Sequence, residues 1–192
     1  MNLRQMLSSR HSKSGKTFFI AIDGRAGSGK STLAQWLAKE LDAQVVMTDD
    51  FASWNNPFNW WLAVIEQVFH PIRNGSQSIS YPRTKWWDNH HPEPVINQPV
   101  TGIMILEGVG SSRKEFQEYI SLNIFVDTAR DICLRRGLER DRGTGKTAKE
   151  LTRLWEGWFE EEEKYLQRDQ PREHADIEID GTKPLEDQIT LS

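Results

Sequence analysis

Residues 24–31 read Gly-Arg-Ala-Gly-Ser-Gly-Lys-Ser and follow an apolar run, residues 17–22, with the pattern of a strand buried on both faces. They match the pattern G-x-x-x-x-G-K-[ST] at every fixed position. The glycines let the backbone wrap closely, so that its amides point at phosphate oxygens. The helix expected over residues 31–41 directs its positive amino end to the same place. The sequence therefore predicts a phosphate-binding loop.

Two side chains of this loop have expected tasks of their own. Lys30 reaches the β- and γ-phosphates of a nucleotide, and Ser31 offers an oxygen to Mg²⁺. The alternative is a chance glycine-rich turn, which fits less well between a buried strand and an amphipathic helix. The loop residues expected to contact the nucleotide are Gly24, Ala26, Gly27, Ser28, Gly29, Lys30, Ser31 and Thr32.

Strand-like runs alternate with helical spacing along the chain. The expected strands are residues 17–22, 45–47, 103–106, 122–126 and 177–179, and the main expected helices are 31–41, 58–69, 130–142 and 147–166, after a short helix near the start. This alternation predicts an α/β fold with a doubly wound, mostly parallel sheet, whose ligands bind at the carboxyl ends of the strands. A length of 192 residues suits one domain spanning 1–192. Residues 75–99, rich in proline, predict an irregular excursion with a small hairpin.

Charge and cysteine content narrow the class of protein. With 24 Lys and Arg against 28 Asp and Glu the net charge is −4, so the surface as a whole does not attract nucleic acid or an anionic membrane. The single cysteine, Cys133, cannot form an intrachain disulfide, which fits a reducing cytoplasm. The first apolar run is too short for a membrane span or a signal peptide. We expect a cytoplasmic protein, monomeric or homo-oligomeric, that binds neither a nucleic acid polymer nor a membrane.

Acidic residues follow two of the predicted strands. Asp49 and Asp50 come after the strand at 45–47, where a kinase needs a carboxylate to accept the proton of the attacking hydroxyl and to help order Mg²⁺. Because the strand ends there, adjacent side chains should diverge, and one of the two suffices. Glu107 ends the strand at 103–106, where it can hold the metal or a metal-bound water. The alternatives are a capping or turn aspartate and a glutamate bonded to loop amides.

Positive charge is concentrated in a predicted helix and the stretch after it. Four arginines stand within eight positions: Arg135, Arg136, Arg140 and Arg142. The planar guanidinium binds two phosphate oxygens at once. Gly143 and Gly145 then interrupt the chain before the next helix, and we predict that a lid over about residues 136–147 swings over the nucleotide. The alternative is a solvated face whose arginines pair with neighbouring acids.

Eight tryptophans are many for a chain of this length. Trp155 and Trp158, three apart on the last long helix, are interpreted as core. Four others lie around the excursion, which we take as the acceptor-binding segment over about residues 52–99: Trp60, Trp61, Trp86 and Trp87. Core packing is the first interpretation of these four, and aromatic walls for a planar acceptor are the second.

Two further features have plain interpretations. His90 and His91 would point apart in an extended segment, so a surface or substrate-contacting role is favoured over a metal pair. The acidic run at residues 160–163 is interpreted as a solvated helix face.

Together these motifs resemble the uridine kinase-like branch of the P-loop kinases over roughly residues 17–181, as a divergent bacterial member. The resemblance lies in Ile22-Asp23-Gly24 leading into the loop, Asp49-Asp50-Phe51, Glu107-Gly108, the stretch 136–141, and late Glu162, Tyr165 and Ala175-Asp176. Uridine kinases carry an Asp-His-Pro element shortly after the catalytic aspartate. Here that place reads Phe58-Asn59-Trp60, without an acid for ribose hydroxyls, so the nucleoside does not follow from the resemblance.

The resemblance implies a five-stranded parallel sheet, Mg-ATP as donor and transfer of the γ-phosphate to a hydroxyl of a small molecule; a nucleoside of the uridine or cytidine type is one candidate. It makes Asp49 the general base, with Lys30 and Arg140 also catalytic and Ser31, Asp49 and Glu107 on the metal side. The lid adds two nucleotide contacts, Arg136 and Arg142. The alternative function is a P-loop ATP-binding module or regulatory ATPase, which the aromatic excursion disfavours.

Overall fold

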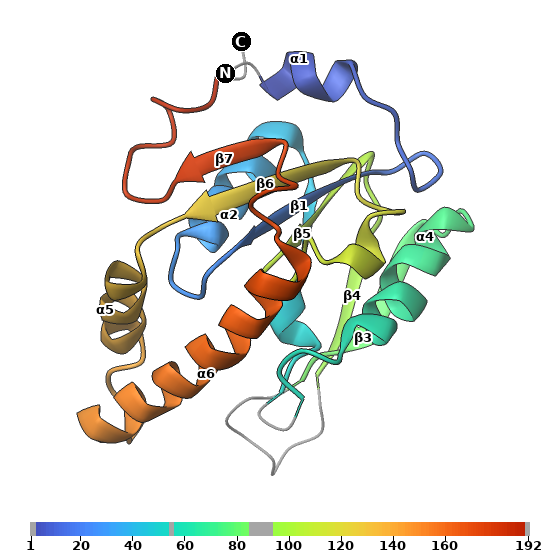
Figure 1. Cartoon of the computed structure of the whole chain (residues 1–192). Helices are drawn as coiled ribbons and strands as arrows, with labels where there is room; N and C mark the ends of the chain where they lie inside the picture. The colour runs from blue at the N-terminus through green and yellow to red at the C-terminus, as the bar shows by residue number, and fades with distance from the viewer. Residues whose placement is uncertain (1–2, 54–55, 85–93, 191–192) are drawn as a thin grey trace.

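Helices and strands alternate along a chain that folds around one central sheet (Figure 1). The structure is a computed structural model that describes residues 3–53, 56–84 and 94–190. The elements of these residues are, in chain order, α1 (Leu3–Ser8), β1 (Phe18–Gly24), α2 (Lys30–Leu41), β2 (Gln44–Met47), η1 (Thr48–Asp50), α3 (Trp61–Val64), η2 (Ile65–Phe69), α4 (His70–Arg73), β3 (Ser78–Pro82), β4 (Val95–Pro99), β5 (Ile103–Glu107), η3 (Lys114–Phe116), β6 (Leu122–Asp127), α5 (Arg130–Arg140), α6 (Ala148–Asp169) and β7 (Ile177–Asp180).

The central sheet has five strands in the order β2-β5-β1-β6-β7, and every pair is parallel. This confirms the predicted α/β fold. Its register sets Met47 of β2 opposite Glu107 of β5, and Glu107 opposite Ile22 of β1. The carboxyl ends of three neighbouring strands therefore lie level, and the loops that leave them meet at one edge of the sheet.

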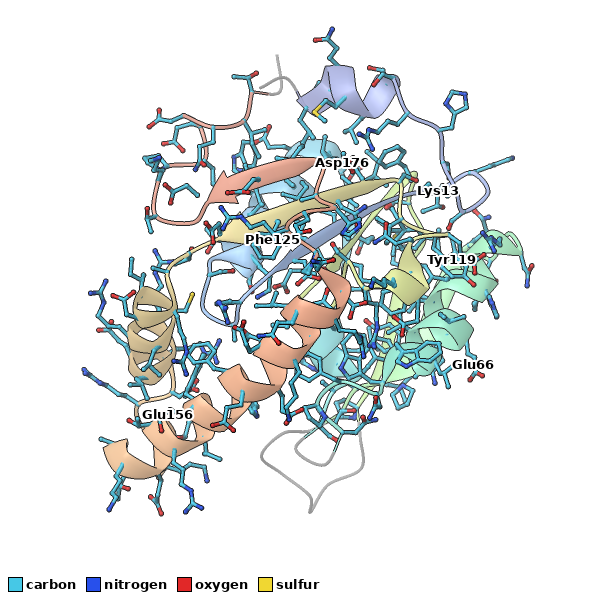
Figure 2. All side chains as sticks on the ribbon, viewed as in Figure 1. Lys13, Glu66, Tyr119, Phe125, Glu156 and Asp176 are labelled. Atoms are coloured by element: carbon cyan, nitrogen blue, oxygen red, sulfur yellow. The ribbon has the colours of Figure 1, made fainter. Side chains whose placement is uncertain are left out.

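Both faces of the sheet are covered, as the unbroken apolar runs predicted. Successive side chains of β1 alternate between the faces: Ile20 and Ile22 join the core beneath α2, whereas Phe19 and Ala21 join the core beneath α3 to α4. On this second face Tyr119, labelled in Figure 2, stacks on Phe69 with ring centroids 4.5 Å apart. Fully buried strands of this kind hold their carboxyl ends rigidly.

The helix predicted to stop before Pro71 instead continues to Arg73, so that boundary was wrong. Residues 61–73 are helical throughout, with a π-helical turn, η2, immediately before α4. A proline inside a regular α-helix removes a hydrogen bond and clashes with the carbonyl four residues earlier. The π-helical turn shifts the hydrogen-bond pattern of the helix. Pro71 therefore falls in the first turn of α4, where a proline is tolerated.

The proline-rich excursion does contain the predicted hairpin. β3 and β4 pair antiparallel, from Ser78 opposite Pro99 to Pro82 opposite Val95. The hairpin is tied to the main sheet's edge, because the amide of Thr84 donates to the carbonyl of Asp50 over 2.7 Å. It therefore lies against the loop that follows β2.

The long helix α6 crosses the front of the sheet, and α5 lies beside its amino-terminal half (Figure 1). It begins at a reciprocal cap between Thr147 and Glu150 and ends three residues later than predicted, at Asp169. Its buried face changes character along the helix, from apolar Trp155 and Phe159 to polar Glu162, Tyr165 and Asp169. Among the described residues, no helix has both the length and the apolar character of a membrane span.

Two helix glycines provide a matched test of the α5–α6 packing. A Cβ on Gly137 of α5 would lie 2.1 Å from the indole of Trp155, whereas one on Gly157 of α6 would meet nothing within 4 Å. We expect Gly137→Ala to lower the free energy of unfolding by about 1–3 kcal/mol through overpacking. Gly157→Ala should raise it by up to about 1 kcal/mol, because alanine is the better helix former. Chemical denaturation measures both; equal effects would contradict the close packing.

Candidate active site

The loop at residues 24–31 joins β1 to α2 and is held tightly against its neighbours. A Cβ on Gly24 would lie 2.4 Å from the carbonyl oxygen of Val126, and one on Gly27 would lie 2.6 Å from that of Cys133. Both glycines have positive φ, 141° and 81°, which other residues rarely adopt. Gly24, a fixed position of the pattern, and Gly27, a variable one, are thus required by the loop's own packing as well as by a ligand.

Lys30 opens α2 and is 6% exposed. Its ammonium donates to the carbonyl of Arg25 over 2.8 Å, so the side chain folds back across the loop. Lys30 lines the cavity together with Ala26 and Gly27 of the same loop. A cation held over a ring of backbone amides suits phosphate oxygens.

The two residues predicted for the metal side lie together. The hydroxyl of Ser31 donates to Oε1 of Glu107 over 3.1 Å, which the level ends of β1 and β5 make possible. Burial raises the pKa of Glu107, with the charge of Lys30 opposing the shift and that of Asp49 adding to it. Hydroxyl and carboxylate oxygens are the ligands Mg²⁺ prefers, so this pair fits the metal, and its role stays a prediction.

The two aspartates after β2 diverge, as the strand end predicted. Asp49 is exposed and lines the cavity. Asp50 is buried and turned to the hairpin, where Oδ1 is 2.8 Å from Nε of Arg83 and Oδ2 accepts from the hydroxyl of Tyr81 over 3.3 Å. Burial raises the pKa of Asp50, and Arg83 opposes the shift. Asp49 therefore faces the cavity while Asp50 anchors the hairpin.

The cavity has a polar and an aromatic part. Its polar part holds the loop, Lys30, Ser31, Asp49 and Glu107. Its aromatic and apolar walls come from separate segments: Ala52, Pro57, Phe58, Trp60, Val109 and Trp158. A site of this composition can hold a charged phosphate tail next to a flat or apolar compound.

The tryptophans divide between core and cavity wall. Trp155 is 2% exposed and belongs to the core, as expected, but Trp158 lines the cavity, which corrects its assignment to the core. Trp60 is buried, donates its indole N–H to the carbonyl of Pro57 over 2.9 Å and also borders the cavity. Trp86, Trp87, His90 and His91 lie outside the described residues.

The arginines predicted for the lid occupy three different environments. Arg136 donates to the carbonyls of Gly27, Ser28 and Gly181 at 3.0–3.4 Å, so it braces the loop from the side of α5. Arg140 lines the cavity, lies over the Trp155 ring at 5.4 Å and pairs with Asp141. Arg142 is exposed. Neither Arg136 nor Arg142 is among the described residues that line the cavity.

The interpretation of residues 160–163 as a solvated face is wrong for Glu162. Glu162 is 2% exposed, lines the cavity and accepts from the loop amide of Ala26 over 2.9 Å. Its neighbour Glu163 pairs with Arg25 at 2.7 Å. The signal was present in the spacing: Glu162 lies three and seven residues after the buried Phe159 and Trp155, on the same helix face.

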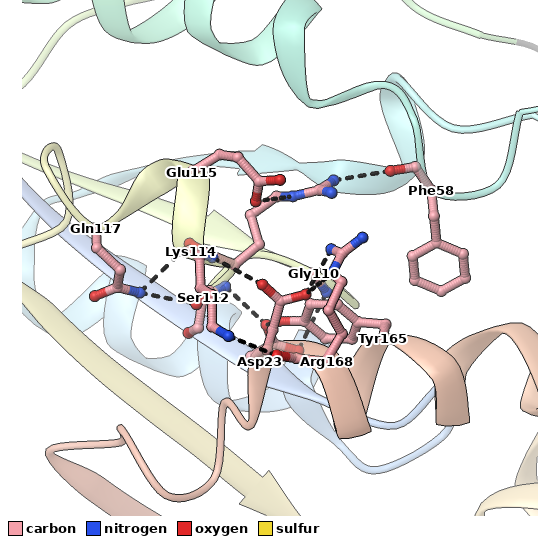
Figure 3. Close-up of polar contacts among 11 residues, drawn as sticks. Asp23, Phe58, Gly110, Ser112, Lys114, Glu115, Gln117, Tyr165 and Arg168 are labelled. Atoms are coloured by element: carbon pink, nitrogen blue, oxygen red, sulfur yellow. Dashed lines mark hydrogen bonds and ion pairs between the residues drawn. The ribbon is translucent and has the colours of Figure 1, made fainter.

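Sequence reasoning also assigned no task to Asp23, which the structure buries completely at the end of β1. Its carboxylate accepts four hydrogen bonds of 2.7–3.2 Å, from the amides of Gly24, Gly110 and Ser112 and from the hydroxyl of Tyr165 (Figure 3). Burial raises the pKa of Asp23, and these bonds oppose the shift. One carboxylate thus joins the phosphate loop, the loop after β5 and α6.

Arg113 is a second buried charge that sequence reasoning missed. It is 1% exposed, pairs with Glu115 at 3.0 Å and donates to the carbonyl of Phe58 over 2.8 Å (Figure 3). Its guanidinium also lies 5.5 Å from the Trp60 ring. Arg113 therefore holds the aromatic wall of the cavity against the loop that Asp23 fixes.

Comparisons with known proteins agree with this architecture. The sequence matches the Phosphoribulokinase / Uridine kinase family over residues 50–184. It is 28% identical over 151 residues to a uridine kinase of Enterobacter sp. (strain 638), covering 67% of this chain and 70% of that protein, and 27% identical over 144 residues to a uridine kinase of Proteus mirabilis (strain HI4320), covering 64% and 67%.

Among solved structures, one described as a possible uridine kinase from Bacillus stearothermophilus superposes with a TM-score of 0.63 at 18% identity, over 92% of this chain and 94% of that one. At this identity the likeness shows the fold alone. The sequence match carries the assignment further, to a nucleotide-binding protein of the kinase type. The chain belongs to the phosphoribulokinase/uridine kinase family, as its motifs predicted.

Proposed function

We propose that the protein transfers the γ-phosphate of Mg-ATP to a hydroxyl of a small molecule of the nucleoside type. The observation that carries the proposal is a single cavity that joins the phosphate loop, the Ser31–Glu107 pair and Asp49 to walls formed by Phe58, Trp60 and Trp158. The uridine kinases among its relatives support a nucleoside acceptor.

On the donor side, the chain's task is to hold and neutralise the phosphates. The loop amides and Lys30 bind the β- and γ-phosphates, with Gly24 to Thr32 as the contact segment, and Arg136 braces the loop while adding positive charge nearby. Mg²⁺, held by Ser31 and Glu107 with Asp49 adjacent, would neutralise charge that develops on the phosphate oxygens. The phosphate loop, Ser31, Glu107 and Asp49 fit both the phosphates and Mg²⁺, because they lie together at the level carboxyl ends of β1, β2 and β5.

On the acceptor side, Asp49 takes the proton of the attacking hydroxyl. It is the aspartate that faces the cavity, and its exposure leaves it able to reach an acceptor. Arg140, at the same cavity, offsets charge on the transferred group, and Arg142 joins it when the lid closes. Closure would also exclude water, which otherwise competes for the phosphoryl group.

The direct test measures ATP turnover by the purified chain with and without a panel of nucleosides and free sugars. We expect little turnover alone and strong stimulation by one class of hydroxyl compound, with a phosphorylated product. Steady ATP hydrolysis that no acceptor changes would favour a regulatory ATPase and contradict the proposal.

Lys30→Ala tests the donor site. Removing the cation over the β- and γ-phosphates should reduce phosphate transfer by at least about a hundredfold, as loss of other preorganised charge-stabilising groups does. Lys39→Ala, at the exposed carboxyl end of the same helix, is the control and should retain activity. Near-native transfer by a folded Lys30→Ala variant would show that the loop is not the donor site.

The divergence of the two aspartates makes a paired prediction. Asp49→Asn should lower kcat by about 10²- to 10⁴-fold, the usual contribution of a general base, while the affinity for nucleotide persists. Asp50→Asn should be milder, because Asp50 is turned to Tyr81 and Arg83. Steady-state kinetics with the identified acceptor measures both, and the reverse order of the losses would transfer the role of base to Asp50.

We also predict that residues 136–147 exchange their amide hydrogens rapidly without ligand and slow down when nucleotide binds. Residues 142–150 are exposed, and the chain between α5 and α6 forms turns, bends and irregular backbone, features of a segment that opens locally. Hydrogen exchange with and without a non-hydrolysable ATP analogue measures this. Protection confined to residues 24–31 would leave Arg140 and Arg142 on a static helix end and disprove the lid.

A further inference from the structure

Glu162 is a buried carboxylate on α6 that borders the phosphate loop. Its side chain is 3% exposed, and it lines the cavity together with Lys30 and Ala26. Buried residues on both sides of Glu162 hold this part of α6 in place. Trp155 and Phe159 are buried before it, and Tyr165, which donates to Asp23, is buried after it. Glu162 is therefore a fixed part of the loop's wall.

The two oxygens of this carboxylate have different surroundings. Oε2 accepts from the amide of Ala26 over 2.9 Å. Oε1 has no hydrogen-bond partner among the described residues; its nearest cation, Nη1 of Arg25, lies 3.6 Å away, beyond hydrogen-bonding distance. A buried oxygen without a hydrogen bond costs free energy. Because this oxygen lies beside the cavity, a ligand bound there can supply the missing hydrogen bond.

The charges around Glu162 are mixed. Lys30 and Arg25 from the loop favour the ionised form, whereas Asp23 at the end of β1 disfavours it, and Cys133 on α5 adds a neutral thiol. On its own helix, Glu163 is engaged by Arg25. Burial dominates and raises the pKa of Glu162 to about 7. Near neutral pH the group is therefore close to the point where it gains a proton.

We propose that Glu162 binds the terminal phosphate of the nucleotide in its protonated form, donating from Oε1 while Oε2 keeps the amide of Ala26. This rests on the proposed role of residues 24–31 as the donor site. A phosphate bound at this loop would add negative charge beside Glu162, and a nearby like charge favours the protonated form of a carboxylate. A proton from solvent added at Oε1 removes the repulsion and lets Oε1, which has no hydrogen bond among the described residues, donate one to the phosphate. Triphosphate binding is then coupled to the uptake of one proton.

Calorimetric titration of the full chain with Mg-ATP, in buffers of different ionisation enthalpy, counts the protons taken up. At pH 8 the wild-type protein should take up about one proton more than Glu162→Gln, whose amide donates at every pH. The nucleotide's own protons cancel between the two titrations. Equal uptake by both proteins overturns the proposal.

Affinity measured against pH gives a second readout. Between pH 7 and pH 9 the affinity of the wild-type protein for Mg-ATP should fall by up to about tenfold per pH unit, because the ionised form must first be protonated. Glu162→Gln should lose this dependence. An equal wild-type affinity at pH 7 and pH 9 refutes the proposal, even if no variant folds.

Two more variants sharpen the test. Glu162→Ala has no donor and should bind Mg-ATP more weakly than Glu162→Gln; equal affinities would make Glu162 a competitor that the phosphate displaces, and the proposal would fail. Glu163→Gln is the matched control, because Glu163 also pairs with Arg25 but lies at the surface, and it should keep the wild-type pH dependence. Absence of any Mg-ATP binding by the wild-type protein would instead refute the proposed function.

Discussion

The buried carboxylate of Asp23 is the interaction on which the rest of the site depends. A charge removed from water is tolerated only when donors surround it, and Asp23 obtains its donors from three separate segments: the start of the phosphate loop, the loop after β5, and Tyr165 of α6. A shift of any one of these segments would remove a hydrogen-bond donor from the buried carboxylate. The carboxyl end of β1 is therefore held by hydrogen bonds to three separate segments.

The hydrogen bonds of Asp23 position residues in both the polar and the aromatic part of the cavity. Toward the donor part, Tyr165 holds α6 in the position that puts Glu162, one turn earlier, against Ala26. Toward the acceptor part, the loop held at Ser112 continues into Arg113, whose bond to the carbonyl of Phe58 positions the aromatic wall. The polar and aromatic walls of the cavity are therefore built on one buried network, which in the proposed function would give the two substrates a fixed relative position.

The sequence was sufficient for the sheet, the phosphate loop and the divergence of Asp49 from Asp50, because these follow from local patterns: unbroken apolar runs, spaced glycines and a strand end. It was insufficient where tertiary contacts decide. The π-helical turn before Pro71 has no local signature. Glu162 was hidden in a run of four glutamates, since charge alone suggests solvent, although its helical spacing from Trp155 points inward. The roles of Asp23 and Arg113 depend on partners about 55 to 142 residues away in the chain.

The composition of the cavity also bears on how the proposed metal site would be completed. The described residues contain no group of three or more acidic, histidine or cysteine side chains able to hold a metal, and Ser31 with Glu107 supplies two of the six oxygens that Mg²⁺ requires. Under the proposed function, phosphate oxygens of the nucleotide and water would supply most of the others. In that function Lys30, which donates to the carbonyl of Arg25, would exchange this carbonyl for a phosphate oxygen, and the bound phosphates would be the anion that attracts the arginines of the proposed lid.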